Sequence, residues 1–330
     1  MGCDLTAVRA LARLLGSSGA GLCVALALSA TPAHAAVYWV TVAGLGGEED
    51  YEQRFAGEAA EVEKALKSSD AGVHLQTLAG AQATRVALTA ALNEVARQAM
   101  PDDDFVLLLI GHGSFDGATY KFNLPGPDIS ATQLAELCNA IPARRQLIIN
   151  TTSASGGSIA ALQRNGRAVI SATKAGSEKN ATVFSRYWVE ALQDPAADTD
   201  KSDSISALEA FQYAAGKTAE FYKAEKRIAT EHAVFEDVGH GAPVREVAAD
   251  AASKSPEGRL LASITLVRLG AAREQAADPA KREQLARKEK LLQQIDALKY
   301  QKAAMPDAEY QSQLKALLLD LARAQAALDQ

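Results

Sequence analysis

Two loops of small polar residues carry the groups best suited to chemistry in this chain. The first loop, residues 111–114, contains His112 and follows the apolar run 105–110. The second loop, residues 150–158, is rich in serine, threonine and glycine and follows the apolar run 146–149. Imidazole and hydroxyl groups bind ligands and take part in proton transfer. Open parallel sheets place their ligands beyond the carboxyl ends of the strands, so we expect the site where these two loops meet.

Strand and helix patterns alternate from residue 37 to residue 172. Continuous apolar runs of this length are typical of strands that are covered on both faces, as in parallel sheets. The patterns predict strands at 37–43, 73–78, 105–110, 146–149 and 167–172, and helices at 51–67, 84–100, 131–141 and 158–164. Further helices are predicted at 181–192 and from 206 to about 228. Such alternation predicts an α/β fold, a three-layer sandwich with a mostly parallel sheet.

Composition limits the classes of protein to be considered. The chain has 330 residues, of which 48% are hydrophobic and 22% are charged, and this is enough to bury at least one full core. Its formal net charge is -6, and no basic stripe is present. We therefore expect no binding to nucleic acid.

Residues 1–35 have the pattern of a signal peptide. Arg9 and Arg13 precede the apolar segment 22–28, and 33–35 is a small-x-small cleavage site. We expect a mature protein that begins near Ala36, is secreted or periplasmic, and has no membrane span. A retained membrane anchor is the alternative.

One cysteine and two histidines are predicted to have no role in catalysis or metal binding. Removal of a signal would take Cys3 and Cys23, which leaves Cys138 on the apolar face of a helix, where a buried thiol behaves as a small hydrophobe. His232 and His240 lack the further ligands that zinc requires, so we expect both in loops.

The strand ending in His112-Gly113, followed by a later strand ending in a loop with Ser155-Gly156, resembles the caspase and legumain group of peptidases (the C13-like, caspase-haemoglobinase fold). In that group a catalytic His lies in the His-Gly pair, and the nucleophile is the Cys of an acid-Ala-Cys-x-Ser-Gly run. The resemblance implies that His112 is the catalytic histidine and that Ser153 occupies the Cys position. It covers roughly residues 37 to 215.

The opening of the chain is similar to legumain in spacing, with Gly44, Gly47 and Tyr51 in register. Where legumain has Arg-His after this Tyr, the chain has Glu-Gln, and Arg54 comes one step late. The resemblance therefore implies binding of a peptide, without legumain-like Asn specificity. The substrate-binding residues that it implies are Gly44, Tyr51, Arg54, Ser155 and Gly156.

Two functional hypotheses follow, because Thr152-Ser153 replaces the Ala-Cys of the peptidase group. In the first, the protein is a degenerate peptidase that binds a peptide or a protein. In the second, Ser153, or else Thr152, is a working nucleophile. His112 is then the general base, and the backbone amides of Gly113 and Ser153 hold the oxyanion. No cofactor is expected for either function.

Residues 198–209 are open to two interpretations. Oxygen-bearing side chains occur at the spacing of a calcium loop, at Asp198, Asp200, Ser202 and Glu209, although Asp203 replaces the glycine of the sharp turn. Alternatively, residues 206–209 form a capping box at the start of the next helix.

The last part of the chain differs in composition from the rest. We place a boundary between a caspase/legumain-like domain, residues 36–242, and a C-terminal helical region, residues 243–330. No strand is predicted from residue 258 onward. Two apolar stripes flank Met305-Pro306 and predict a helical hairpin of coiled-coil type. The hairpin can pack on itself, dock on the sandwich or pair with a second chain to form a homo-oligomer.

Overall fold

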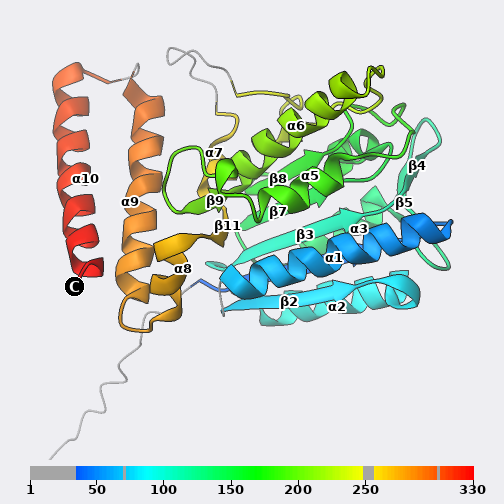
Figure 1. The fold of residues 1–330 in the computed structure, drawn as a ribbon, viewed down its shortest axis with the longest axis horizontal. Coiled ribbons are helices and arrows are strands. Elements are labelled where there is room, and N and C mark those ends of the chain that lie inside the picture. Colours follow the sequence, from blue (N-terminus) through cyan, green and yellow to red (C-terminus); the bar gives the residue numbers. More distant parts are fainter. Residues whose placement is uncertain (1–34, 70–71, 248–255, 303–304) are drawn as a thin grey trace, which may run out of the picture. The chain divides into compact units, whose positions relative to one another are not determined.

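The computed structural model describes residues 35–69, 72–247, 256–302 and 305–330 (Figure 1). Residues 1–34 of the predicted signal, with both of its cysteines, lie outside the described residues. From Ala35 onward, the described part of the chain forms one compact unit.

A six-stranded sheet forms the centre of this unit, in the order β10-β8-β7-β3-β1-β2 (Figure 1). Its neighbouring strands are parallel, except that β10 runs antiparallel to β8. The bounds are β1 Val37–Ala43, β2 Val73–Leu78, β3 Asp104–Ile110, β7 Arg145–Asn150, β8 Arg167–Ser171 and β10 Val234–Glu236. The predicted strands are confirmed to within two residues.

Helices cover both faces of the sheet. Successive residues of a strand point to opposite faces, so Val106 and Leu108 of β3 join one core while Leu107 and Leu109 join the other. The first core includes side chains of α1 (Glu49–Ser69), α5 (Phe184–Ala191) and α6 (Ala207–Ala224). The second includes those of α2 (Arg85–Gln98), α3 (Ala131–Asn139) and α4 (Ile159–Leu162). The predicted three-layer α/β sandwich is confirmed.

Local sequence signals set several helix boundaries. The hydroxyl of Thr84 accepts a hydrogen bond at the start of α2, and Ser130 with Gln133 forms a capping box at α3. Cys138 is fully buried in α3, and burial raises the pKa of its thiol to about 11. The packing role predicted for this cysteine fits these surroundings. Short 3-10 helices lie in the loops at η1 Gly80–Gln82, η2 Ser155–Ser158 and η3 Pro195–Ala197.

The C-terminal region shares the core of the sandwich. It contains α7 (Arg259–Ser263), β11 (Thr265–Arg268), α8 (Gly270–Ala277), α9 (Arg282–Gln301) and α10 (Asp307–Leu328). Strand β11 pairs with β9 (Ser204–Ser206), and Leu261, Ile264 and Val267 join the first core. The expectation of no strand after residue 258 is wrong, because β11 pairs with β9, which is distant in the sequence. Core contacts of Leu261, Ile264 and Val267 also cross the boundary placed between residues 242 and 243.

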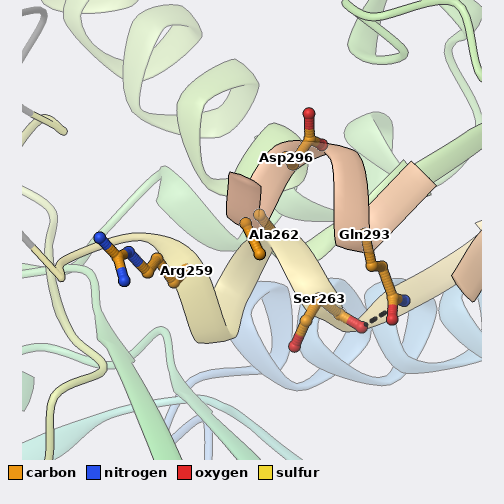
Figure 2. Close-up of a pocket in the computed structure, with 6 residues that line it drawn as sticks. Arg259, Ala262, Ser263, Gln293 and Asp296 are labelled. Carbon is orange, nitrogen blue, oxygen red and sulfur yellow. Dashed lines mark hydrogen bonds between the residues drawn. The ribbon is translucent and has the colours of Figure 1, made fainter. Parts of the chain in front are cut away.

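The predicted helical hairpin is confirmed, with α9 and α10 side by side and Pro306 at the N-cap of α10 (Figure 1). Helix α9 in turn meets α7 around a small cavity of about 90 Å³, where Nε2 of Gln293 donates to the carbonyl of Ser263 at 3.0 Å (Figure 2). Among the described residues, no helix combines the length and apolarity needed to cross a membrane.

Candidate functional site

Parallel pairing carries the two polar loops to the same edge of the sheet. Leu109 of β3 is in register with Asn150 of β7, so the residues that follow each strand emerge side by side. Beyond the strand ends, the amide of Gly113 donates to Oγ of Ser153 at 3.1 Å. The expectation from sequence that these two loops meet is therefore correct.

The hydroxyl of Ser153 forms its hydrogen bonds with the backbone of Gly113. Its Oγ also donates to the carbonyl of Gly113 at 3.1 Å, and the residue is only 3% exposed. A serine nucleophile needs a hydrogen bond to its general base. In the part of the chain that the structure describes, no hydrogen bond joins this hydroxyl to His112. The Gly113 amide, predicted to hold an oxyanion, is occupied by the same hydroxyl.

A closed network of hydrogen bonds lies beneath Ser153. Oδ1 of Asn150 accepts from Oγ1 of Thr152 at 2.8 Å and from the hydroxyl of Tyr120 at 3.2 Å, while its Nδ2 donates to Oγ of Ser158 at 3.0 Å. Thr152 is fully buried, and its hydroxyl also lies 2.6 Å from that of Tyr120. The hydroxyl of Thr152 faces the interior, which disfavours a nucleophilic role, and that role stays a prediction.

The residues predicted to bind substrate at the end of this loop are turned toward β8. Oγ of the fully buried Ser155 accepts from Oγ of Ser171 at 2.9 Å, and the amide of Gly156 donates to Oγ1 of Thr173 at 2.9 Å. These polar groups hold the loop in place, and the role in substrate binding stays a prediction.

A three-stranded antiparallel sheet packs over the strand ends. It consists of β4 (Gly113–Phe115), β5 (Tyr120–Phe122) and β6 (Ile129–Ser130). A Cβ at Gly44 would lie 2.5 Å from the carbonyl oxygen of Asn123 and 2.7 Å from the ring of Phe122. Gly44, predicted to bind substrate, is buried and instead permits this close packing.

His112 is half-buried between two aromatic rings. Its ring lies edge-on to Tyr51 at 4.8 Å and to Phe55 at 5.2 Å between centroids. Burial lowers the pKa of His112, and the positive charge of Arg54 lowers it further, although a hydrogen bond with the backbone of Gly46 acts in the opposite direction. The surroundings therefore favour the neutral imidazole.

Replacing His112 by leucine is expected to make the protein's stability less sensitive to acid. Because folding lowers the pKa of His112, the unfolded chain binds more protons than the folded chain below the ordinary value of about 6.5. Stability then falls as the pH drops through that value. Urea unfolding at about pH 7.5 and about pH 5.5 checks this. An equal loss of stability in wild type and His112→Leu would contradict the expectation.

An open cleft of about 470 Å³ adjoins the aromatic rings around His112. Tyr51 and Arg54, both predicted to bind substrate, line this cleft. Residues 180–183, from the segment that precedes α5, also line it. Arg227 and Thr230, from the segment after α6, complete the lining. Residues 180–183, Arg227 and Thr230 were not predicted from the sequence as part of a site, because nothing in their local pattern marks them.

The cleft is rich in positive charge. Among the described residues, its lining includes Arg54 and Arg227 and no acidic residue. The Arg54 guanidinium stacks on the ring of Tyr51 at 4.9 Å from its centroid, and its NH2 donates to the carbonyl of Thr182 at 3.5 Å. Behind the lining, Glu58 lies 3.7 Å from Nε of Arg54, and burial raises the pKa of this carboxyl. The Nε itself makes no hydrogen bond.

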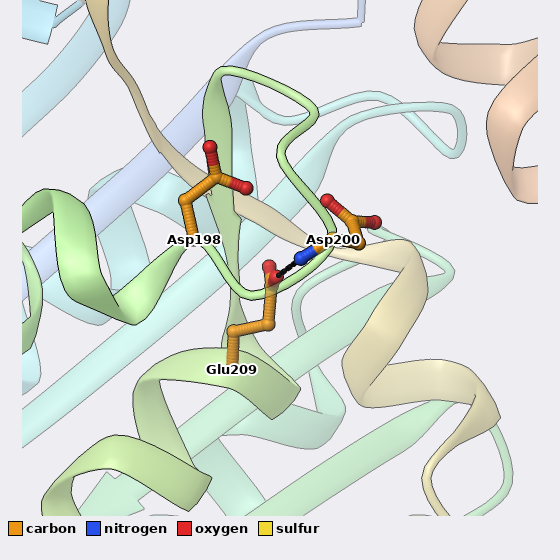
Figure 3. Close-up of side chains that lie close together, drawn as sticks. All are labelled: Asp198, Asp200 and Glu209. Carbon is orange, nitrogen blue, oxygen red and sulfur yellow. Dashed lines mark hydrogen bonds between the residues drawn. The ribbon is translucent and has the colours of Figure 1, made fainter.

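Residues 198–209 form a compact acidic loop. Carboxylate oxygens of Asp198, Asp200 and Glu209 lie within 4.8 Å of one another (Figure 3). Oε1 of Glu209 accepts from the amides of Thr199 and Asp200, and its Oε2 accepts from the amide of Ser206. The capping box of residues 206–209 is confirmed.

The other two carboxylates and Ser202 serve the same turn. The amide of Ser202 donates to Oδ1 of Asp198 and to Oδ1 of Asp200, both at 3.0 Å, and the amide of Asp203 donates to Oδ2 of Asp198. These carboxylates already have backbone donors, so the arrangement favours the capping interpretation. Calcium binding stays a prediction.

No protein-family model matches the chain, and no curated protein matches it. Among solved structures, the chain is similar to the Drosophila initiator caspase Dronc, with 10% identity over 64% of this chain and 82% of that one, at a TM-score of 0.42. It is also similar to protein GSU0716 from Geobacter sulfurreducens, with 12% identity over 72% of this chain and 99% of that one, at a TM-score of 0.44. With both scores below 0.5, the fold class rests on the strand order and pairing described above.

Proposed function

We propose that the protein is an exported peptide-binding protein, secreted or periplasmic, built as a degenerate relative of caspase- and legumain-like peptidases. The cleft beside the aromatic rings around His112, whose described lining contains two arginines and no acidic residue, is the observation that carries this proposal. The His112-Gly113 and Ser155-Gly156 motifs support the peptidase relationship, and the signal-like pattern of residues 1–35 supports export.

The surroundings of Ser153 favour binding over hydrolysis. Its hydroxyl both accepts from and donates to the backbone of Gly113, so its proton is directed to the Gly113 carbonyl and not to the imidazole. The His112 ring packs edge-on against Tyr51 and Phe55. A hydrolase would require the Ser153 side chain to leave Gly113 and to pair with His112.

The charge of the cleft favours an acidic side chain of the peptide. A carboxylate placed between Arg54 and Arg227 would receive charge-assisted hydrogen bonds from planar guanidinium groups. Stacking on Tyr51 orients the Arg54 guanidinium, so little side-chain entropy would be lost on binding. Asn180 supplies a further polar side chain to the lining.

Peptides that contain Asp or Glu are expected to bind about tenfold more tightly than the same peptides with Asn or Gln. Fluorescence anisotropy with the purified protein and matched labelled peptide pairs measures this ratio. Arg54→Gln is expected to abolish the preference. The matched control is Arg323→Gln, which removes a guanidinium from the exposed surface of α10.

Two outcomes would overturn this function. Equal binding of acidic and amide peptides by the wild type would contradict the proposed preference for an acidic ligand. If the wild type cleaves the peptides and Ser153→Ala does not, Ser153 is a working nucleophile. The proposed function would then be that of a hydrolase.

A further inference from the structure

One wall of the cleft belongs to a segment that we call the strap, residues 174–183, which joins β8 to α5. Residues 180–183 of the strap line the cleft. Near its end, Oγ1 of Thr182 donates to the carbonyl of Thr151 at 2.6 Å. The amide of Val183 donates to Oε1 of the buried Glu231 at 2.7 Å, so this end is fixed on two sides.

The middle of the strap is fixed by Glu178. Its carbonyl accepts from the amide of Ala154 at 2.7 Å, directly after Ser153. Ala154 has a positive φ of 56°, which is a conformation that a non-glycine residue holds only when its surroundings impose it. The position of Glu178 is therefore tied to the loop that presents Ser153.

His232 holds the carboxylate of Glu178. Nδ1 of His232 lies 2.5 Å from Oε1 of Glu178, and the amide of His232 donates to Oε2 at 3.2 Å. An ionised carboxylate only accepts hydrogen bonds, so in that state Nδ1 is the donor of this pair. Lys174 also faces the carboxylate, with its amide 3.0 Å from Oε2 and its Nζ 3.8 Å from Oε1. Both side chains of the Glu178–His232 pair are largely shielded, 12% and 26% exposed.

We propose that Glu178 and His232 are positioning residues for the peptide cleft. The imidazole fixes the carboxylate of Glu178, the carbonyl of Glu178 fixes the loop at Ala154, and residues 180–183 of the strap line the cleft together with Tyr51 and Arg54. This inference rests on the proposed function for its ligand, while its effect on the strap is independent of any ligand. His232, expected from sequence to be an ordinary loop residue, would set the shape of the cleft.

The strap is tested first without a peptide, by hydrogen exchange of backbone amides. His232→Leu keeps a side chain of similar size without a donor, and it is expected to raise the exchange rate at Ala154 and in the strap about tenfold. His232→Asn places an amide N–H near the position of Nδ1–H and is expected to restore protection. His240→Leu, which changes an exposed imidazole on the following turn, is the control.

The same variants are then compared for peptide binding. His232→Leu is expected to reduce the ratio of affinities for acidic and amide peptides about fivefold, and His232→Asn to restore it. Glu178→Gln, which keeps the shape of the side chain, serves if His232→Leu does not fold. It is expected to act in the same direction.

The outcomes for the pair and for the proposed function are distinguishable. Unchanged exchange in both His232→Leu and Glu178→Gln would overturn the positioning role, as would increased exchange with an unchanged affinity ratio. Increased exchange in a protein whose wild type binds no acidic peptide would support the link from His232 to the strap and contradict the proposed function.

Discussion

Replacing Gly156 by alanine is expected to lower the free energy of unfolding by about 3 kcal/mol. A Cβ at this position would lie 2.6 Å from Cα of Ala175 and still closer to the amide nitrogen of the same residue. These are backbone atoms, so no side chain can rotate to relieve the overlap. The loop that carries Ser153 would have to move away from the segment that follows β8.

Equilibrium urea unfolding of wild type and Gly156→Ala measures this loss. The matched control is Gly57→Ala, because Gly57 lies in the middle of α1 with nothing within 4 Å of an added Cβ. Alanine favours a helix more than glycine does, so this variant is expected to gain about 0.5–1 kcal/mol. A Gly156→Ala protein as stable as the wild type would contradict the close packing of the loop.

Replacing Asn150 by leucine is expected to cost about 3 kcal/mol as well, for an electrostatic reason. Leucine has a similar size but leaves the hydroxyls of Thr152, Tyr120 and Ser158 without their shared partner in a site that water does not reach. Each hydroxyl keeps a second partner, but three buried hydrogen bonds are lost together, and each contributes about 1 kcal/mol.

Tyr120→Phe provides the graded comparison for Asn150→Leu. It removes one hydroxyl and leaves the amide of Asn150 in place, so the expected loss is about 1 kcal/mol. Thermal and urea unfolding of both variants give the two values. A loss for Asn150→Leu no greater than that for Tyr120→Phe would mean that the network beneath Ser153 contributes little to stability.

Local patterns in the sequence determined most of the scaffold. Apolar runs predict the strands because a strand buried on both faces needs no polar side chains. The capping boxes at Ser130 and Ser206 close within four residues, so their partners are already adjacent in the chain. The rule for parallel sheets was enough to bring Gly113 and Ser153 together, because it depends only on strand direction.

Tertiary structure decided which partner each polar group takes. The hydroxyl of Ser153 binds the backbone of Gly113, the hydroxyl of Thr152 turns inward to Tyr120, and β11 becomes a strand by pairing with β9. The second arginine of the cleft and the partner of Glu178 come from segments far along the chain. A sequence shows that a hydroxyl, an imidazole or a guanidinium is present. Its partners depend on packing between residues tens of positions apart, which no local pattern encodes.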